Sequence, residues 1–347
     1  MYEVDFLPVE SDTGTGTKSG DAIAVRFTVE SQSHNAVLVV DGGHAATGDS
    51  LIEHVRTYYK TSTVDLMVST HPDADHLNGL ATVIEELDVH ELLVHRPRFH
   101  ASNVTNFSNL EALDNLISVA KTNDTTITEP FTGLSRFDGQ LLVLGPTAAY
   151  YEQLLAEHLL EAGLGLSAKS WGLSPLLLAR ATKLMERALA YLPVETLTDD
   201  EETTPRNNSS VISLLQVDGQ RLFLTGDAGI PALTAAAEYY GVAVGDFLTA
   251  PLSFFQAPHH GSRHNVGPTV LDRILGPRSY PYNPGMVSFV SSAKGSEKHP
   301  SPKVVNALAR RGCQVFATEG TTIHHGHDAP VRYGWTQLTP VPPLAED

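Results

Sequence analysis

The hydrophobic positions in the first part of the chain alternate between strand-like and helix-like spacing. Apolar side chains at every second position over 23–29 predict a half-buried strand, and the continuous apolar run 36–40 predicts a fully buried one. Apolar residues at helical spacing over 51–59 predict a helix with one apolar face. A further short strand over 64–68 leads into a polar loop, after which a helix pattern begins at about His76.

The later part of the chain repeats this alternation after a segment of different character. Residues 147–192 are rich in Leu and Ala at helical spacing, and an acidic polar run follows them. Two strand patterns, at 211–217 and 221–225, flank an Asp-Gly pair, which is typical of a β-hairpin. We therefore expect one domain over residues 1–347, built from two similar halves with a helical insertion at 147–204 between them.

Composition places the chain among globular proteins rather than disordered or membrane-spanning ones. Hydrophobic residues make up 41 % and charged residues 18 % of its 347 residues. No stretch approaches the ~18 consecutive apolar residues of a membrane span, and the N-terminus has no signal-peptide pattern. The single Cys313 cannot form an intramolecular disulfide, which fits a reducing compartment. We therefore expect a cytoplasmic protein that makes no contact with a membrane.

The net charge limits the kinds of partner that the surface can bind. The chain has 23 Lys and Arg against 40 Asp and Glu, which gives a formal net charge of −17. Broad, non-specific binding to nucleic acid needs a basic surface, so this composition opposes it. An anionic substrate is still compatible with the charge, because bound metal ions reverse the local sign of the field.

The loop after the strand at 64–68 carries the densest cluster of chemically active side chains. Four potential metal ligands, His71, Asp73, Asp75 and His76, fall within six residues between a strand and a helix. Alternate residues of an extended loop point the same way, so the first three can converge while His76 turns in at the helix start. Imidazole and carboxylate together suit Zn²⁺, Mn²⁺ or Fe²⁺. The loop therefore predicts a metal site.

Two later segments have the same form, a polar cluster just past a strand. Asp227 follows the strand at 221–225, with Gly226 beside it, and His259 and His260 stand together before a turn. Added to the first loop, these side chains supply enough ligands for a two-metal site, with an Asp able to bridge the ions.

The order of these motifs resembles the metallo-β-lactamase superfamily and, within it, the hydrolase domain of ComEC-type DNA-uptake proteins. The motifs are Asp41-Gly42-Gly43, His71-Pro72-Asp73-Ala74-Asp75-His76, Asn207-Asn208-Ser209-Ser210, Gly226-Asp227, His259-His260-Gly261-Ser262 and His299-Pro300. The resemblance covers about residues 1–97 and 205–325. It implies a four-layer αββα sandwich of mixed α and β structure, with a site at one edge that hydrolyses its substrates, often phosphodiesters, by means of metal ions.

The resemblance also assigns roles within the cluster. It places His71 and Asp73 on a first metal, Asp75 and His76 on a second, and Asp227 between them. One of His259 and His260 would complete the second metal and the other would face the substrate. We favour His259 as the ligand and His260 as the catalytic side chain.

Two departures from the family pattern change the expected metal chemistry. Asp73 stands where the wider superfamily has a second His, which favours Mn²⁺ without excluding Zn²⁺. The His that usually precedes the second-half hairpin is absent, and Asn207, Asn208 and Ser209 occupy that region. The first metal is then either weakly held or completed by water or an amide oxygen.

A basic loop late in the chain is the candidate for substrate binding. Lys298 and His299 lie in the segment 294–303, which is locally basic in an acidic protein. Such groups beside a metal pair would bind a phosphate; the alternatives are a solvated surface loop, or His299 as a metal ligand. We also place Ser262 and Asn208 among the substrate-binding residues.

We predict a hydrolase that uses two divalent ions, Zn²⁺ or Mn²⁺, to cleave a phosphodiester, with DNA or RNA as candidate substrates. Asp75 or Asp227 would orient the attacking water, and His260 and His299 would assist at the reacting phosphate. The alternatives are a hydrolase of small phosphoesters or cyclic nucleotides, which the net charge favours, and a metal-binding interaction protein with weak catalysis. The insertion at 147–204 would serve as a lid over the site, or as the surface for a homodimer or a protein partner.

Overall fold

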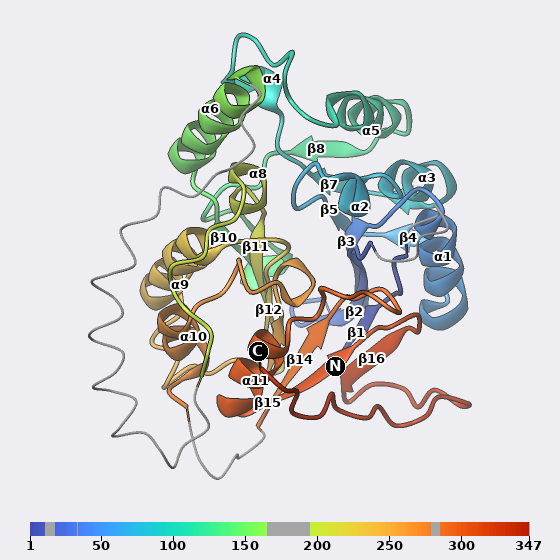
Figure 1. Cartoon of the computed structure of the whole chain (residues 1–347). Coiled ribbons are helices and arrows are strands. Elements are labelled where there is room, and N and C mark those ends of the chain that lie inside the picture. Colours follow the sequence, from blue (N-terminus) through green and yellow to red (C-terminus); the bar gives the residue numbers. More distant parts are fainter. Residues whose placement is uncertain (11–17, 33, 165–194, 279–284, 347) are drawn as a thin grey trace.

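The computed structural model describes residues 1–10, 18–32, 34–164, 195–278 and 285–346, and it contains two seven-stranded sheets that lie face to face (Figure 1). In spatial order the first sheet consists of β16 (Ile323–His327), β1 (Tyr2–Phe6), β2 (Ala22–Val29), β3 (His34–Gly42), β5 (Leu66–Val68), β7 (Glu91–Leu93) and β8 (Thr126–Thr128). The second consists of β15 (Cys313–Ala317), β14 (Met286–Val290), β13 (Phe254–Gln256), β12 (Gln220–Leu224), β11 (Ile212–Val217), β10 (Leu141–Gly145) and β9 (Ser135–Arg136). A separate small sheet pairs β4 (Thr63–Val64) with β6 (Asp88–Val89).

The two sheets have the same internal plan. Each sheet has antiparallel strands on one side and parallel strands on the other, and the change falls at β3 in the first sheet and at β12 in the second. Parallel strands carry their polar loops at the same edge, because every carboxyl end points the same way. Both halves therefore present loops to a common edge of the sandwich.

Helices cover the outer side of each sheet (Figure 1). Those of the first half are α1 (Thr47–His54) with the π-helical turn η1 (Val55–Tyr59), α2 (Ala74–Leu77), α3 (Leu80–Glu86), α4 (Pro97–His100) and α5 (Leu110–Thr122). Those that follow are η2 (Phe137–Gly139), α6 (Ala148–Leu164), α8 (Pro205–Asn208), α9 (Ile230–Ala243), η3 (His259–Gly261), α10 (Pro268–Leu275) and α11 (Pro302–Arg310).

The alternation of side chains along the central strands builds this layering. In β3, Val37 and Val39 pack against the helices, whereas Leu38 and Val40 pack between the two sheets. The strand β11 divides its residues between the two cores in the same way. Because both faces of these strands are buried, four layers result, and the αββα sandwich predicted from the sequence is confirmed.

The helical insertion is described only at its two ends. The helix α6 buries Tyr151, Leu154 and Leu155, and it packs against α4 and α8 near the metal-ligand loops. Residues 165–194, on which most of the predicted lid falls, lie outside the described residues. None of the described helices is both long enough and apolar enough to cross a bilayer.

The last strand of the fold pairs with the first. The strand β16 lies antiparallel to β1, with Tyr2 opposite His327 and Phe6 opposite Ile323. A buried ion pair between Arg332 and Asp5, at 2.6 Å, fixes the segment after β16 to the same strand.

We predict that Phe254→Ala lowers the free energy of unfolding by about 3–5 kcal/mol, because the ring is fully buried between the sheets. Its centroid lies 5.9 Å from that of Phe6 and 5.2 Å from that of Phe289. Urea unfolding followed by circular dichroism measures the loss. The control is Phe99→Ala, at a ring that is 68 % exposed, and it should cost less than about 1 kcal/mol. Equal losses in the two variants would contradict the assignment of Phe254 to the core.

Candidate metal centre

A buried carboxylate joins the two strands that carry the first ligand loop. Asp41, at the end of β3, accepts hydrogen bonds from the backbone N–H of Thr70 at 2.8 Å and from its hydroxyl at 2.6 Å. The Nδ1–H of His76 donates to the same carboxylate at 2.8 Å. The loop approaches so closely that a Cβ on Gly79 would lie 2.1 Å from the carbonyl oxygen of Gly42. Asp41 therefore fixes the imidazole of His76 and leaves its Nε2 directed away from the strand.

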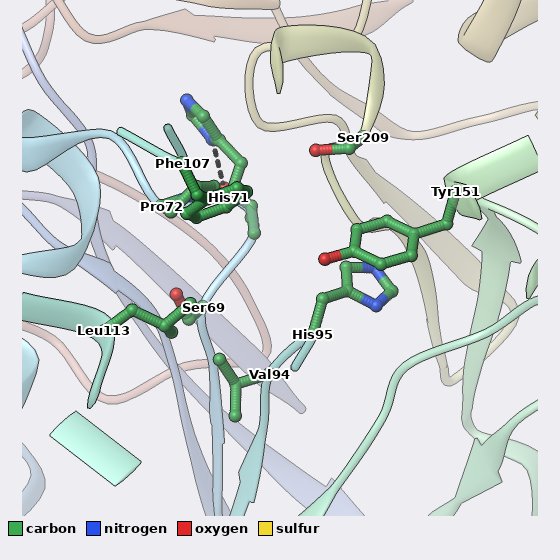
Figure 2. Close-up of a pocket in the computed structure, with 10 residues that line it drawn as sticks. Ser69, His71, Pro72, Val94, His95, Phe107, Leu113, Tyr151 and Ser209 are labelled. Carbon is green, nitrogen blue, oxygen red and sulfur yellow. Dashed lines mark hydrogen bonds between the residues drawn. The ribbon is translucent and has the colours of Figure 1, made fainter. Parts of the chain in front are cut away.

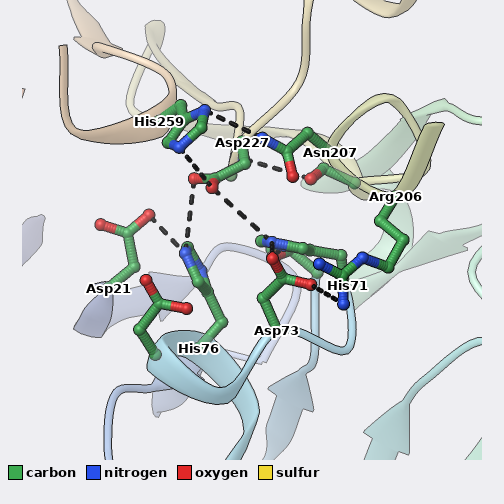
Figure 3. A network of polar contacts seen from close by, with 12 residues as sticks. Asp21, His71, Asp73, His76, Arg206, Asn207, Asp227 and His259 are labelled. Atoms are coloured by element: carbon green, nitrogen blue, oxygen red, sulfur yellow. Dashed lines mark hydrogen bonds and ion pairs between the residues drawn. The ribbon is translucent and has the colours of Figure 1, made fainter. Parts of the chain in front are cut away.

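Asp227 lies at the centre of the cluster, with each carboxylate oxygen facing different partners (Figure 3). Its Oδ1 is 3.4 Å from Nε2 of His76, and its Oδ2 is 3.6 Å from Nε2 of His71 and 3.6 Å from Nε2 of His259. The backbone N–H of Asp227 donates to the hydroxyl of Ser210, which holds the turn after β12. This one side chain thus contacts ligand candidates from both halves of the fold.

The turn η3 brings His259 and His260 to the same cluster. His260 is buried, and its Nε2 lies 3.9 Å from Oδ2 of Asp75. The donor atoms of Asp75, His76 and His260 lie within 4.8 Å of one another, and so do those of Asp227, His259 and His260. The geometry thus favours His260, more than His259, as the histidine beside Asp75 and His76.

Asp73 lies at the rim of the cluster, between the ligands and an arginine. Its Oδ2 is 3.9 Å from Nε2 of His71, while its Oδ1 is 3.1 Å from the guanidinium of Arg206 on α8 (Figure 3). Burial raises the pKa of Asp73 above its ordinary value, and the charge of Arg206 offsets part of this increase. Asp73 can therefore offer one oxygen to a metal while the other stays paired with Arg206.

The donor atoms fit a metal site because they lack other partners. Among the described residues, His71 Nε2, His76 Nε2, Asp227 Oδ1 and His260 Nδ1 are buried without a hydrogen-bond partner. Unpaired buried polar atoms are costly, so their convergence requires a function. Two ligands of one tetrahedral ion bound at ~2.1 Å are ~3.4 Å apart. The separations around Asp227, 3.4 and 3.6 Å, match that spacing.

Electrostatics in the cluster also favour a cation. Burial lowers the pKa of His71 well below its ordinary value, and burial lowers the pKa of His260 to about 4. Both imidazoles are therefore neutral at pH 7 and can bind a metal. Burial opposes the charged form of His76, but the carboxylates of Asp227 and Asp41 raise the pKa of His76 well above its ordinary value. Negative potential is thus concentrated on this ring, where a metal ion would replace the proton.

A cavity of about 500 Å³ opens beside the ligand candidates. Its lining includes Asp75, His259, His260, Lys298 and His299. The centroid of the His299 ring is 5.9 Å from that of His259, so the loop predicted to bind phosphate does reach the cluster. Lys18 also lines this cavity.

The two remaining substrate-binding candidates are held by backbone contacts. Ser262 is buried, and its hydroxyl accepts from the backbone N–H of His264 at 3.2 Å. The side-chain oxygen of Asn208 accepts from the backbone N–H of Gly229 at 3.1 Å, just after Asp227. In this structure both side chains support the ligand turns, and their contact with substrate stays a prediction.

A second, smaller cavity lies behind His71 (Figure 2). It has a volume of about 20 Å³, room for a single water molecule, and Ser69, His71 and Ser209 line it together with His95 and Tyr151. The rings of His95 and Tyr151 stack at 4.3 Å. The helix α6 thus lies next to the His71 loop and contributes Tyr151 to this cavity.

Three residues of the centre were missed in the sequence. Asp21 is buried, its Oδ2 accepts from the side-chain amide of Gln256 at 2.8 Å, and burial raises the pKa of Asp21 to about 7. Arg206 and Asn265 contact Asp73 and His259 respectively. Arg206 directly precedes the motif at 207–210, and Asn265 lies three residues after the motif at 259–262, so their sequence neighbourhood was the available signal. Asp21 was marked only by its position directly before an apolar strand.

We predict that Asp41→Asn weakens divalent-metal binding by about 10- to 100-fold, because an amide cannot replace the carboxylate that orients His76. The amide oxygen can still accept from Thr70, so the near-ultraviolet circular dichroism should stay unchanged. Competition with a chromophoric chelator for Mn²⁺ or Zn²⁺ measures the affinity. Asp49→Asn, at an exposed position on α1, is the control and should bind like the wild type. Unchanged affinity in Asp41→Asn would remove His76 from the ligand set.

Comparison with known proteins gives a family match in the first half of the chain. Residues 19–171 match the family model of the Metallo-beta-lactamase superfamily. A search of curated proteins gives no match.

Three solved structures that resemble the chain do so weakly. The first, described as "a putative metallo-beta-lactamase" from Thermotoga maritima, has 11 % identity and a TM-score of 0.35, and the match covers 65 % of this chain and 78 % of that one. The second, the E377D mutant of CmlA beta-hydroxylase, has 12 % identity and a TM-score of 0.44, and the match covers 93 % of this chain and 53 % of that one. The third, a long form RNase Z from yeast, has 10 % identity and a TM-score of 0.36, and the match covers 96 % of this chain and 39 % of that one. The chain therefore spans about half of the hydroxylase and about two fifths of the RNase Z. At these TM-scores we draw no activity or ligand from the three proteins. Residues 19–171 are thus similar to the Metallo-beta-lactamase superfamily, and the αββα architecture is consistent with the fold of that superfamily.

Proposed function

We propose that this chain is a metal-dependent hydrolase that cleaves phosphodiester bonds with an activated water. One observation carries the proposal: buried His and Asp donor atoms without hydrogen-bond partners converge on Asp227 beside a cavity of about 500 Å³ whose lining includes Lys18 and Lys298. Such donors suit Mn²⁺ or Zn²⁺, and ammonium groups at the same cavity suit an anionic substrate.

The ligand set would hold two divalent ions. When bound, such ions lower the pKa of a water molecule and polarise the phosphoryl oxygen. The chain's own residues would supply the rest of the chemistry. Asp227 lies between the histidines, and Asp75 lines the cavity, so either carboxylate can accept a hydrogen bond from the attacking water and orient it.

The loop with Lys298 and His299 would bind the phosphate group. Both residues line the cavity, and Lys18 lies there as well. Burial lowers the pKa of His299 to about 4, so its imidazole is neutral at pH 7 and can donate one hydrogen bond to a phosphate oxygen. These contacts would strengthen as negative charge develops in the transition state.

Hydrolysis of a small phosphoester or cyclic nucleotide is the second candidate. The cavity volume, about 500 Å³, lies in the range of pockets for small ligands. The net charge of −17 opposes long contacts with a polynucleotide backbone. Parallel assays on a fluorescent oligonucleotide, a cyclic nucleotide and bis-nitrophenyl phosphate, each with and without Mn²⁺, separate these substrates. A protein that binds metal yet hydrolyses none of them would instead fit an interaction role.

We predict that Asp75→Ala abolishes hydrolysis of the best of these substrates while the protein stays folded, because its loop projects from an independently packed sandwich. Turnover and near-ultraviolet circular dichroism are measured on the same preparation, with Asp49→Ala as the exposed control. Retained turnover would refute the proposed mechanism. Lost turnover together with lost near-ultraviolet signal would indicate a structural role for the site.

We predict that Lys298→Ala and His299→Ala each lower kcat by about 10²-fold without loss of bound metal, because their contacts with the phosphate strengthen in the transition state. Steady-state kinetics and elemental analysis of the same samples test this. Lys294→Ala, an exposed change in the same segment and away from the cavity lining, should match the wild type. Lower metal content in His299→Ala would make His299 a ligand, and unchanged kinetics in both variants would make the loop an ordinary surface.

A further inference from the structure

The segment before the second-half hairpin supplies no histidine, so the first metal position lacks a ligand there. In the structure this segment is α8, which carries Arg206 and Asn207. His71 and Asp73 alone come from the first ligand loop to that side of Asp227. The cluster must either leave this position incomplete or complete it from elsewhere in the chain.

The carboxylate of Asp227 divides the imidazoles into two groups. Its Oδ1 faces Nε2 of His76 at 3.4 Å. Its Oδ2 faces Nε2 of His71 and Nε2 of His259, each at 3.6 Å (Figure 3). His259 therefore faces the same oxygen as His71. His260 lies with Asp75 and His76, and one of its ring nitrogens also lies within 4.8 Å of the donor atoms of Asp227 and His259.

The backbone of the η3 turn explains how two adjacent histidines can point to different places. His259, His260 and Gly261 have φ values of 48°, 57° and 76°. Left-handed conformations of non-glycine residues cost about 1–2 kcal/mol each and persist where the surroundings impose them. The two imidazole planes differ by 81°. The turn thus presents two adjacent histidines in different orientations.

Asn265 contacts Nδ1 of His259. This fully buried side chain donates from Nδ2 to the backbone carbonyl of Asp227 at 2.7 Å, which turns its Oδ1 toward His259. That oxygen lies 2.9 Å from Nδ1 of His259 and favours a proton there, whereas the side-chain nitrogen of Asn207 lies 2.9 Å from the same atom and favours a lone pair. A metal ion on Nε2 requires the first of these two arrangements. The lone pair of Nε2 then faces Oδ2 of Asp227, as a metal ligand requires.

We propose that His259 and His260 serve different metal ions. His259 joins His71 and Asp73 on the Oδ2 side of Asp227 and replaces the ligand that α8 does not supply. His260 joins Asp75 and His76 on the Oδ1 side. Asn265 is a positioning residue for His259. The proposal rests on the metal-dependent function proposed above, but it concerns metal binding alone and can fail separately.

Metal counts in paired variants test the division. Each protein is dialysed at a Mn²⁺ or Zn²⁺ concentration that just saturates the wild type, and bound ions per chain are measured by elemental analysis. Two ions are expected in the wild type and one in either single variant, His259→Ala or His260→Ala. The double variant His71→Ala/His259→Ala should still hold one ion, because both changes affect the same position. The double variant His259→Ala/His260→Ala should hold none.

Other results would overturn the division. If the two histidines served the same ion, the double variant His259→Ala/His260→Ala would keep one ion. A His299→Ala variant with one ion, beside a His259→Ala variant with two, would assign the missing ligand to His299. A wild type that holds a single ion would refute two positions, and one that holds none would refute the proposed function as well. Two ions with the expected pairing but no hydrolysis would refute the proposed function alone.

Asn265 variants provide a milder test that does not remove a ligand. Asn265→Ala should weaken one of the two ions by about 10- to 100-fold and leave the other unchanged, because it releases the ring of His259. In Co²⁺-loaded protein the same variant should alter the absorption bands of one ion only. Asn265→Asp restores an acceptor for Nδ1–H and should recover most of the affinity. Equal weakening of both ions would indicate general damage to the turn and would overturn the positioning role.

Discussion

The buried carboxylate of Asp227 is the contact on which the site depends, because it faces histidines supplied by both halves of the sandwich. His71 and His76 reach it from the loop after β5, and His259 reaches it from the turn after β13. An isolated charge at this depth would be strongly unfavourable, and a cation held between this carboxylate and the imidazoles would offset the cost. Neither half alone can assemble the ligand set, so the two sheets must first pack against each other.

The sequence predicts the residues that act through local motifs, and it misses those that act through distant contacts. His71, Asp73, Asp75 and His76 could be found because they crowd into one loop after a strand. The αββα layering was implied by the resemblance of the ordered motifs to the metallo-β-lactamase superfamily, whereas the apolar runs predicted only individual strands and helices. The different metal positions that we propose for His259 and His260 could not be predicted, since they depend on positive φ values and on contacts with residues far along the chain.

Asp21 and Asn265 show why the supporting residues are harder to find. Asp21 is held by Gln256, which is 235 residues away, and Asn265 reaches the backbone of Asp227, 38 residues away. A lone Asp or Asn has many ordinary roles in turns, so residue type alone carries little information. The acidic composition has a further effect, because a net charge of −17 raises the concentration of divalent cations around the protein and favours loading of the site.

The pairing of β1 with β16 has a consequence for how the chain folds during synthesis. One of the two neighbours of β1, the strand β16, is made more than 300 residues after it. Until then one edge of β1 is open to pairing with another chain, and its apolar side chains face an incomplete core. Contacts between such distant segments also slow folding. The nascent protein therefore has a long interval in which chaperones can protect this edge, and overexpression should make aggregation there the main competitor of folding.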